Sequence, residues 1–204
     1  MRDIKDFYNK TASEWANNGY EDESLHPYLQ EFLSYLPKNP RILDLCCGAG
    51  YESMRMHKLG AIVTGLDFSE ESIKIAKEHN PNLTFVVDDM LNDFSYLGKF
   101  AGCAVIAGLV HIPSNKLALV FDNIYKVLYD EGVLFIVVKD GIGKSQRLSY
   151  QKIEDEDYDR EFYFHTLDEL KDSSRGKFHF IKELIYEKDS FWKYYLFQKC
   201  HESR

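Results

Sequence analysis

The sequence lacks the features that mark a membrane or secreted protein. No continuous apolar run approaches the length that crosses a bilayer, and the polar, charged start lacks the apolar core of a secretory signal. We therefore expect a cytoplasmic protein that has no contact with a membrane.

Patterns for metal binding and disulfide pairing are also missing. The four cysteines, Cys46, Cys47, Cys103 and Cys200, include no C-x-x-C pair. None of the seven histidines stands in an H-E-x-x-H or similar spacing. Both absences argue against a structural metal and against a disulfide framework.

Acidic residues outnumber basic residues. The chain has 25 Lys and Arg against 33 Asp and Glu, a net charge of −8 and a pI near 5.4. Nucleic acids and anionic membranes attract clustered Lys and Arg, so this balance opposes both partners, although a local basic patch is compatible with it. Internal repeats and low-complexity tracts are absent, and 204 residues of which 45% are hydrophobic suit one domain.

An apolar run, a glycine turn and a helical segment follow one another within residues 41–53. The run before Cys46 is too short for a buried helix and has the length of a central strand, and Gly48 and Gly50 then break any regular pattern. Glycine lets the backbone come close to a ligand, and the helix that begins near Tyr51 directs its unpaired amide groups to the same place. We expect a polar or anionic ligand there.

Three features narrow the class of ligand. Asp44 lies inside the strand, four residues before Gly48, so we expect its carboxylate to end near the ligand. Ser53 stands where the dinucleotide pattern G-x-G-x-x-G has its third glycine. A second apolar strand, residues 61–67, ends in Asp67, at a suitable distance to bind two ribose hydroxyls. Together these residues predict a nucleoside pocket without a pyrophosphate cradle.

The combination resembles the class I S-adenosylmethionine-dependent methyltransferases of the small-molecule type, whose first motif is an acid within strand one followed by a G-x-G turn. Asp44, Gly48 and Gly50 match this motif, whereas Cys46 stands where the family usually has a further glycine. The alternation of strands and helices by itself predicts an α/β fold with a parallel sheet. The resemblance implies a Rossmann-like, mostly parallel seven-stranded sheet with an antiparallel C-terminal hairpin and helices on both faces.

Two later motifs extend the resemblance and imply the cofactor contacts. Asp89 and Met90 follow a strand at the place where the family binds adenine; Asp88 could serve instead, or both acids could merely solvate the strand end. Residues 100–113 resemble the fourth motif, although Ala101 replaces its usual acid. The resemblance implies S-adenosylmethionine as cofactor, with S-adenosylhomocysteine as product. Its expected cofactor-binding residues are Tyr8, Asp44, Cys46, Gly48, Gly50, Asp67, Phe68, Asp89, Met90, Ala107 and Leu109.

Residues 1–38 are expected to form a helical lid before the cofactor-binding core at residues 39–140. The opening helix resembles the aromatic, Ala-containing helix that many small-molecule methyltransferases fold over the cofactor. Tyr8 and Trp15 would then lie near the cofactor's charged end, where a cation over a ring gains roughly 0.5–2 kcal/mol. Both residues could instead only pack the helix onto the domain.

The second half of the chain divides into an acceptor-side insertion, residues 141–165, and a helix with a closing hairpin, residues 166–204. The insertion is rich in charge and Tyr and would overhang the carboxyl ends of the strands, where open α/β sheets bind ligands. Its acidic run, residues 154–159, is more simply a solvated surface. The expected substrate-side residues are Trp15, His111, Tyr150 and Arg160.

The activity that the resemblance implies is methyl transfer to a nucleophilic N, O, S or C atom of a small molecule by in-line displacement. His111 is the candidate general base if the acceptor must lose a proton, and its alternative is to shape the loop or pack under the cofactor. A nicotinamide-dependent oxidoreductase and a non-catalytic S-adenosylmethionine sensor are the competing functions. Methylation of nucleic acid is disfavoured, because no N-P-P-Y, D-P-P-Y or Pro-Cys motif occurs. The acceptor and the oligomeric state leave no readable pattern.

Overall fold

A computed structural model describes residues 4–148, 159–186 and 191–201 and is organised around a seven-stranded sheet. The strand order is β3-β2-β1-β4-β5-β9-β8, in which β1 to β5 pair in parallel and β9 runs antiparallel to both of its neighbours. The strands are β1 Arg41–Leu45, β2 Ile62–Asp67, β3 Thr84–Val87, β4 Phe100–Ile106, β5 Leu128–Lys139, β8 Phe178–Glu183 and β9 Trp192–Lys199. The predicted mostly parallel sheet with an antiparallel C-terminal hairpin is confirmed.

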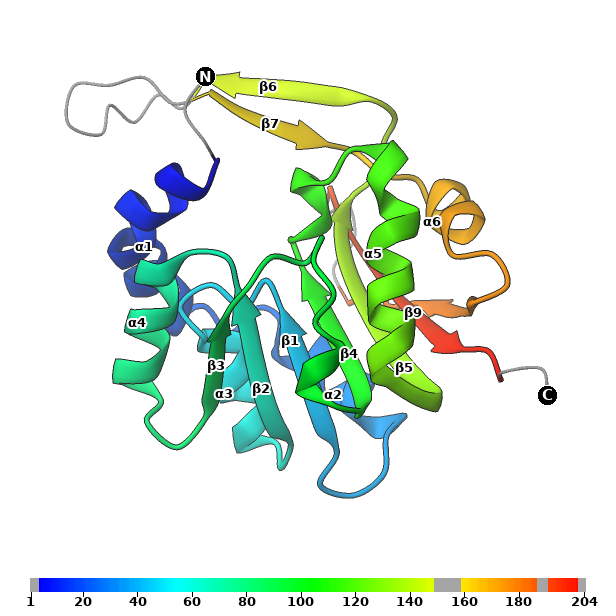
Figure 1. Ribbon diagram of the computed structural model, residues 1–204, viewed down its shortest axis with the longest axis horizontal. Helices are drawn as coiled ribbons and strands as arrows, with labels where there is room; N and C mark the ends of the chain where they lie inside the picture. The colour runs from blue at the N-terminus through cyan, green and yellow to red at the C-terminus, as the bar shows by residue number, and fades with distance from the viewer. Residues whose placement is uncertain (1–3, 149–158, 187–190, 202–204) are drawn as a thin grey trace.

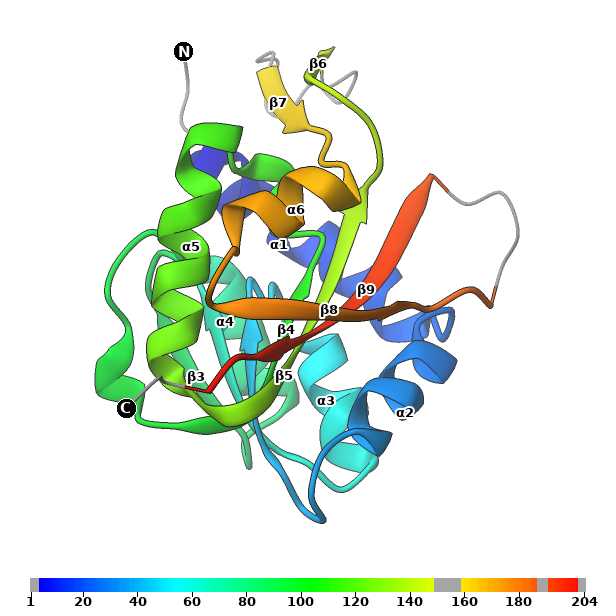
Figure 2. The same ribbon diagram turned by 90° about the vertical axis from the view of Figure 1, so that its right-hand side faces the viewer.

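Helices cover both faces of this sheet (Figure 2). Phe32 of α2 and Met56 of α3 belong to the core on one face, and Phe121 of α5 and Leu170 of α6 belong to the core on the other. Burying apolar side chains on both faces is what stabilises a parallel sheet of this kind. The helices are α1 Ile4–Glu21, α2 His26–Ser34, α3 Tyr51–Lys58, α4 Glu70–His79, α5 Ser114–Val127 and α6 Leu167–Ser173, with single 3-10 turns η1 Ser95–Leu97 and η2 Leu109–His111.

Two helices begin at side-chain caps. The Ser69 hydroxyl accepts a hydrogen bond from the Ser72 amide at 3.1 Å and caps α4. The Thr166 hydroxyl accepts from the Glu169 amide at 3.2 Å and caps α6. Helix α5 begins at Ser114, directly after the extended residue Pro113, and has no side-chain cap.

The chain changes its direction of winding between β1 and β4, which are neighbours at the centre of the sheet. The loops after these two strands diverge and leave a crevice, the usual ligand position in open α/β sheets. Helix α1 and a separate ribbon of β6 (Lys144–Leu148) and β7 (Asp159–Tyr163) lie at this end of the sheet (Figure 1). The topology therefore positions a site between the strand tips and these two coverings.

The segments over the crevice contain regular elements. The insertion at residues 141–165 contains the antiparallel pair β6 and β7, which is not hydrogen-bonded to the main sheet. The segment expected to form a helical lid, residues 1–38, contains two helices, α1 and α2. In the described part of the chain, no helix has both the length and the apolar character required to cross a membrane.

Candidate active site

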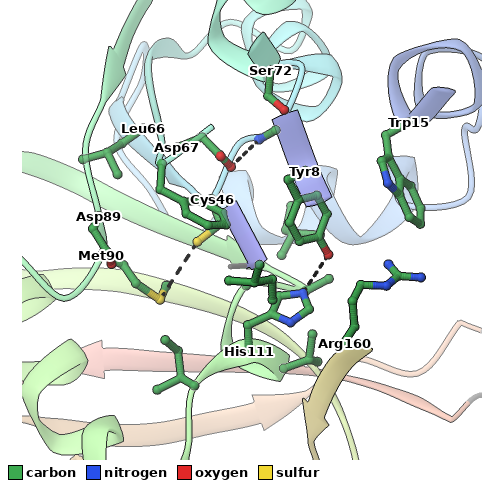
Figure 3. Close-up of a pocket in the computed structure, with 18 of the residues that line it drawn as sticks. Tyr8, Trp15, Cys46, Leu66, Asp67, Ser72, Asp89, Met90, His111 and Arg160 are labelled. Atoms are coloured by element: carbon green, nitrogen blue, oxygen red, sulfur yellow. Dashed lines mark hydrogen bonds between the residues drawn. The ribbon is translucent and has the colours of Figure 1, made fainter. Parts of the chain in front are cut away.

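A cavity of about 510 Å³ opens at the carboxyl ends of the central strands and is lined also by residues of α1 and β7 (Figure 3). The structure places most of the expected site residues on its lining. These are Tyr8, Trp15, Cys46, Gly48, Asp67, Phe68, Asp89, Met90, Ala107, His111 and Arg160. Tyr150 lies outside the described residues.

The two glycines of the turn after β1 have different surroundings. Gly48 lines the cavity with a positive φ of 52°, and a Cβ at this position would meet no atom within 4 Å. Gly50 also has a positive φ, of 81°, but it does not line the cavity, and a Cβ there would lie 2.9 Å from the Phe85 ring. Position 48 therefore requires glycine because of its backbone conformation alone, since the space beside it is open. Position 50 requires glycine both because of its conformation and because the Phe85 ring packs closely against it.

Two residues other than glycine hold left-handed backbone conformations on the lining. Cys46 has a φ of 65° and Ala107 a φ of 57°. Such conformations cost free energy for residues with a Cβ and are concentrated at functional sites. Cys46 occupies the position where the resembled family usually has glycine, which accounts for that preference. Its sulfur lies 4.0 Å from the Met90 sulfur, and burial raises the pKa of its thiol well above the usual value.

Asp67 ends β2 with its carboxylate at the glycine turn. One oxygen accepts a hydrogen bond from the Gly48 amide and the other accepts from the Ser69 amide, each at 2.9 Å. Burial raises the pKa of Asp67, and these backbone donors oppose the shift. Because each carboxylate oxygen has two acceptor positions, Asp67 can hold the turn and still accept hydrogen bonds from a ligand.

The acids after β3 differ in their partners. Asp88 accepts hydrogen bonds from Asn92, from the Tyr96 hydroxyl and from the Asp89 amide, at 2.7 to 2.8 Å. In the described residues the Asp89 carboxylate accepts only from the Leu91 amide, through one oxygen. Asp89 is thus better placed than Asp88 to accept from a ligand. No group of three or more His, Cys, Asp or Glu in the described part of the chain is arranged to hold a metal ion.

Asp44 and Leu109 lie behind the lining, contrary to the expectation that both face the ligand. Asp44 is buried under the turn and accepts a 2.5 Å hydrogen bond from the Ser53 hydroxyl. Burial raises the pKa of Asp44 to about 7. Leu109 is part of the hydrophobic core, and its carbonyl accepts a hydrogen bond from His165 at 3.0 Å. The pattern of the motif identifies these positions but not the face of the backbone from which each side chain leaves.

Tyr8 of α1 reaches across the cavity to His111 of η2 (Figure 3). A 2.7 Å hydrogen bond joins the Tyr8 hydroxyl and His111 Nε2. Burial raises the pKa of Tyr8 to about 12, against the opposing effect of the Arg160 guanidinium. Burial lowers the pKa of His111 to about 4. At neutral pH both groups are therefore uncharged, and α1 does more than pack against the domain because it contributes a polar group to the cavity.

The end of the cavity formed by β5 and β7 is lined by cationic and aromatic side chains. The Arg160 guanidinium carbon lies 4.1 Å from the ring centroid of Phe7 and 5.8 Å from that of Trp15. Lys139 Nζ lies 5.2 Å from the ring centroid of Phe162. Contacts of a cation with an aromatic face at these distances are attractive.

Several lining residues were not identified from the sequence, chiefly Tyr51, Lys139, Phe162 and Trp192. Tyr51 directly follows the glycine turn, so its position in the motif could have indicated it. Lys139 is the last residue of β5, and the carboxyl end of a central parallel strand was an available signal. Phe162 and Trp192 reach the cavity through pairings of distant segments, for which the local sequence has no marker.

Comparisons with known proteins agree with this architecture. A protein-family model described as a methyltransferase domain matches residues 42–132. A Bacillus subtilis protein whose name gives it as a methyltransferase, YqeM, is 32% identical over 108 residues, which are 50% of this chain and 44% of that protein. The ubiquinone biosynthesis O-methyltransferase of Coxiella burnetii is 32% identical over 99 residues, 46% of this chain and 42% of that enzyme. The chain thus spans less than half the length of these curated relatives.

Solved structures extend the likeness over almost the whole chain. The structure of magnesium protoporphyrin IX methyltransferase from Synechocystis with bound S-adenosylhomocysteine superposes with a TM-score of 0.72 at 14% identity, covering 96% of this chain and 98% of that one. At this level of identity the likeness establishes the fold, with its parallel strands and closing hairpin.

Proposed function

We propose that the chain is a class I S-adenosylmethionine-dependent methyltransferase, and that it moves a methyl group from S-adenosylmethionine to a nucleophilic N, O, S or C atom of a small molecule. The observation that carries the proposal is the carboxylate of Asp67 at the tip of β2, bonded to the Gly48 amide on the cavity lining. Relatives named for ubiquinone biosynthesis and for magnesium protoporphyrin support a small-molecule acceptor.

The lining residues suit the three parts of this cofactor. Asp89 has a carboxylate oxygen without a hydrogen bond to the described residues, which suits the adenine amino group, and Met90 offers the ring an apolar surface. Asp67 has acceptor positions left for the ribose hydroxyls. Beside Gly48 an added Cβ would meet no atom, so the amino-acid end has space next to the turn.

When bound, S-adenosylmethionine supplies a methyl group that already carries a good leaving group, so the protein need not create a strong electrophile. The contribution of the chain is position. Holding the acceptor atom, the methyl carbon and the sulfur nearly in line, with reacting atoms about 3–3.5 Å apart, supplies several kcal/mol of barrier reduction. Asp67, Asp89 and the Gly48 turn fix one reactant, and the walls built by α1 and β7 fix the other.

Tyr8 and His111 are the residues for handling a proton. Since burial keeps Tyr8 protonated and His111 neutral, we assign the hydroxyl as donor and Nε2 as acceptor in their hydrogen bond. The Tyr8 oxygen can then accept a hydrogen bond from an N–H or O–H of the acceptor molecule. When that group must lose its proton, the proton passes to Tyr8 as the Tyr8 proton passes to His111. An acceptor atom that is already anionic needs neither residue.

Calorimetric titration with S-adenosylhomocysteine and with NAD tests the cofactor. We expect the former to bind and the latter not to, and we expect Asp67→Ala to weaken binding at least about tenfold through lost hydrogen bonds to the ribose. Asp88→Asn is the matched control, because the Asp88 carboxylate already accepts hydrogen bonds within the protein. The affinity of this variant for S-adenosylhomocysteine should change less than about threefold. Binding of NAD alone would overturn the proposal in favour of an oxidoreductase.

A metabolite screen coupled to homocysteine detection tests turnover. For an uncharged acceptor we expect Tyr8→Phe and His111→Asn to lower kcat more than they raise KM, by about 10²-fold or more. Full turnover in His111→Asn would remove His111 from proton transfer. Tight cofactor binding without turnover on any metabolite would instead support the non-catalytic sensor.

A further inference from the structure

The charges on the cavity lining are separated by sign. The acids Asp67 and Asp89 lie at the tips of β2 and β3, where the proposed function places the nucleoside. The cations Lys139 and Arg160 come from β5 and β7, at the end where the acceptor would enter. Among the described lining residues that end contains no acid.

Both cations meet at one aromatic side chain. Lys139 Nζ and the guanidinium carbon of Arg160 each lie 5.2 Å from the ring centroid of Phe162. The positive charges of both groups lower the pKa of His111, which shows that they act on the same part of the cavity. The positive charges of both groups would attract a carboxylate that enters beside the Phe162 ring.

The aromatic rings around these two cations determine the shape of ligand that this end of the cavity can bind. Lys139 Nζ is 5.1 Å from the ring centroid of Trp192, and Arg160 lies over Phe7 and near Trp15. Arg160 lines the cavity, and its Nε is buried without a hydrogen-bond partner among the described residues. A guanidinium matches a carboxylate in geometry and charge.

We propose that the methyl acceptor is a planar, largely apolar molecule that carries a carboxylate, and that Lys139 and Arg160 bind this carboxylate beside the Phe162 ring. This inference rests on the proposed methyl transfer and specifies its substrate class. The aromatic walls hold the planar body, and the two cations orient it in the site. A cationic amine is excluded as acceptor, because it would enter beside two like charges.

The test uses a matched pair of probes on the whole chain saturated with S-adenosylhomocysteine. We expect 2-naphthoate to bind at least about tenfold more tightly than 2-naphthamide, which has the same rings without the charge. Lys139→Met and Arg160→Gln should each reduce this preference at least about threefold. Lys74→Met, which removes an exposed lysine of α4 that does not line the cavity, should leave it unchanged.

The outcomes separate this inference from the proposed function. Equal affinity for the two probes, no measurable naphthoate binding, or a preference that survives both substitutions would overturn the inference. Loss of S-adenosylhomocysteine affinity in Arg160→Gln, with the naphthoate preference intact, would also overturn it, because the guanidinium would then bind the cofactor's own carboxylate. Failure of the wild-type chain to bind S-adenosylhomocysteine would overturn the methyltransferase proposal itself.

Discussion

At the scale of single residues, a carboxyl group in apolar surroundings releases its proton less readily than one in water. Asp44 is such a group, since its side chain lies under the glycine turn with the Ser53 hydroxyl as a hydrogen-bond donor. The pKa of Asp44 is raised from 3.8 to about 7. The folded state therefore holds a proton that the unfolded chain has already released, and this difference destabilises the fold as pH rises from about 4 to about 7.

Asp44→Asn should remove this pH-dependent cost. The amide oxygen can still accept from Ser53, so we expect the variant to exceed the wild type in unfolding free energy at pH 8 by up to about 4 kcal/mol. At pH 4 the two proteins should differ little, because Asp44 is then protonated in the wild type. Urea unfolding at both pH values measures the difference, with Ser53→Ala as the variant that loses only the hydrogen bond. A variant less stable than the wild type at pH 8 would contradict the assignment.

At the scale of elements, α1 is held against the site at both of its ends. Near its start, Lys5 and Asn9 contact Glu70 at the beginning of α4, with Lys5 Nζ 2.5 Å from the carboxylate. At its other end, the Tyr20 hydroxyl donates to the Ala49 carbonyl at 2.8 Å. The helix thus lies across the cavity with its polar groups paired to the loops that form the cofactor side.

Gly19 sets how closely α1 approaches the lining. A Cβ at Gly19 would overlap the ring of Tyr51, which lines the cavity. We expect Gly19→Ala to displace either the ring or the helix, to cost about 1–3 kcal/mol of stability and to weaken S-adenosylhomocysteine binding about tenfold. Calorimetry and proteolysis of α1 measure both effects. Tyr51→Leu in the same background should relieve the overlap and restore protease resistance, whereas Asn18→Ala is the neutral control. An unchanged affinity in Gly19→Ala would show that α1 does not control the cavity.

The turn η2, which carries His111, is held in place by hydrogen bonds from His165, which lies two residues before α6. His165 is fully buried; its Nε2 donates to the carbonyls of Leu109 and Ile112 at 3.0 and 3.1 Å, and its Nδ1 lies 3.0 Å from a Glu169 oxygen. Among the described residues the Ile112 carbonyl has no other hydrogen-bond partner, whereas the Leu109 carbonyl also accepts from the Ile112 amide at 2.9 Å.

We expect His165→Leu to cost about 1–3 kcal/mol of stability, because it leaves the Ile112 carbonyl unpaired and removes one of the two donors to the Leu109 carbonyl. Since η2 positions His111, turnover should fall more than S-adenosylhomocysteine affinity does. Glu169→Gln keeps a polar partner for Nδ1 and should cause a smaller loss of both stability and turnover. Unfolding curves and steady-state kinetics provide the two measurements. Equal losses of turnover and cofactor affinity in His165→Leu would argue against a specific effect on η2.

At the scale of the whole molecule, cofactor binding should stabilise the fold by mass action. At a concentration of one hundred times the dissociation constant, S-adenosylhomocysteine should add about 2.7 kcal/mol, which corresponds to a rise in Tm of about 5–10 °C for a chain of 204 residues. NAD at the same concentration should shift Tm by less than about 1 °C. Thermal unfolding followed by circular dichroism makes the comparison, and Asp67→Ala should lose most of the shift. A similar rise with NAD would contradict a nucleoside site specific for this cofactor.

The sequence predicted the fold to the extent that its signals are local. The glycine turn and the acid that ends β2 depend on neighbouring residues, and the structure places each where it was expected. Asp44 was expected to face the ligand but is buried behind the lining. Position along a strand does not by itself specify the direction in which a side chain points. The binding of a ligand by the residues that line the cavity stays a prediction.

The acceptor side was less predictable because it is assembled from distant segments. Phe162 reaches the cavity from a ribbon whose strands pair across a connection of ten residues that the structure does not describe, and Trp192 arrives from the last strand of the sheet. Neither has a local pattern that distinguishes a lining residue from a core residue. Their roles depend on tertiary pairing, which single-sequence periodicity does not contain.

The separation of the β6–β7 ribbon from the main sheet has a consequence for evolution. Because the ribbon shares no hydrogen-bond ladder with β1 to β5, its residues can be replaced without changing the register of the strands that carry Asp67 and the Gly48 turn. Selection can therefore alter what is methylated while the methyl donor stays the same. A descendant of this gene could acquire a new product by exchanging a single short stretch of coding sequence.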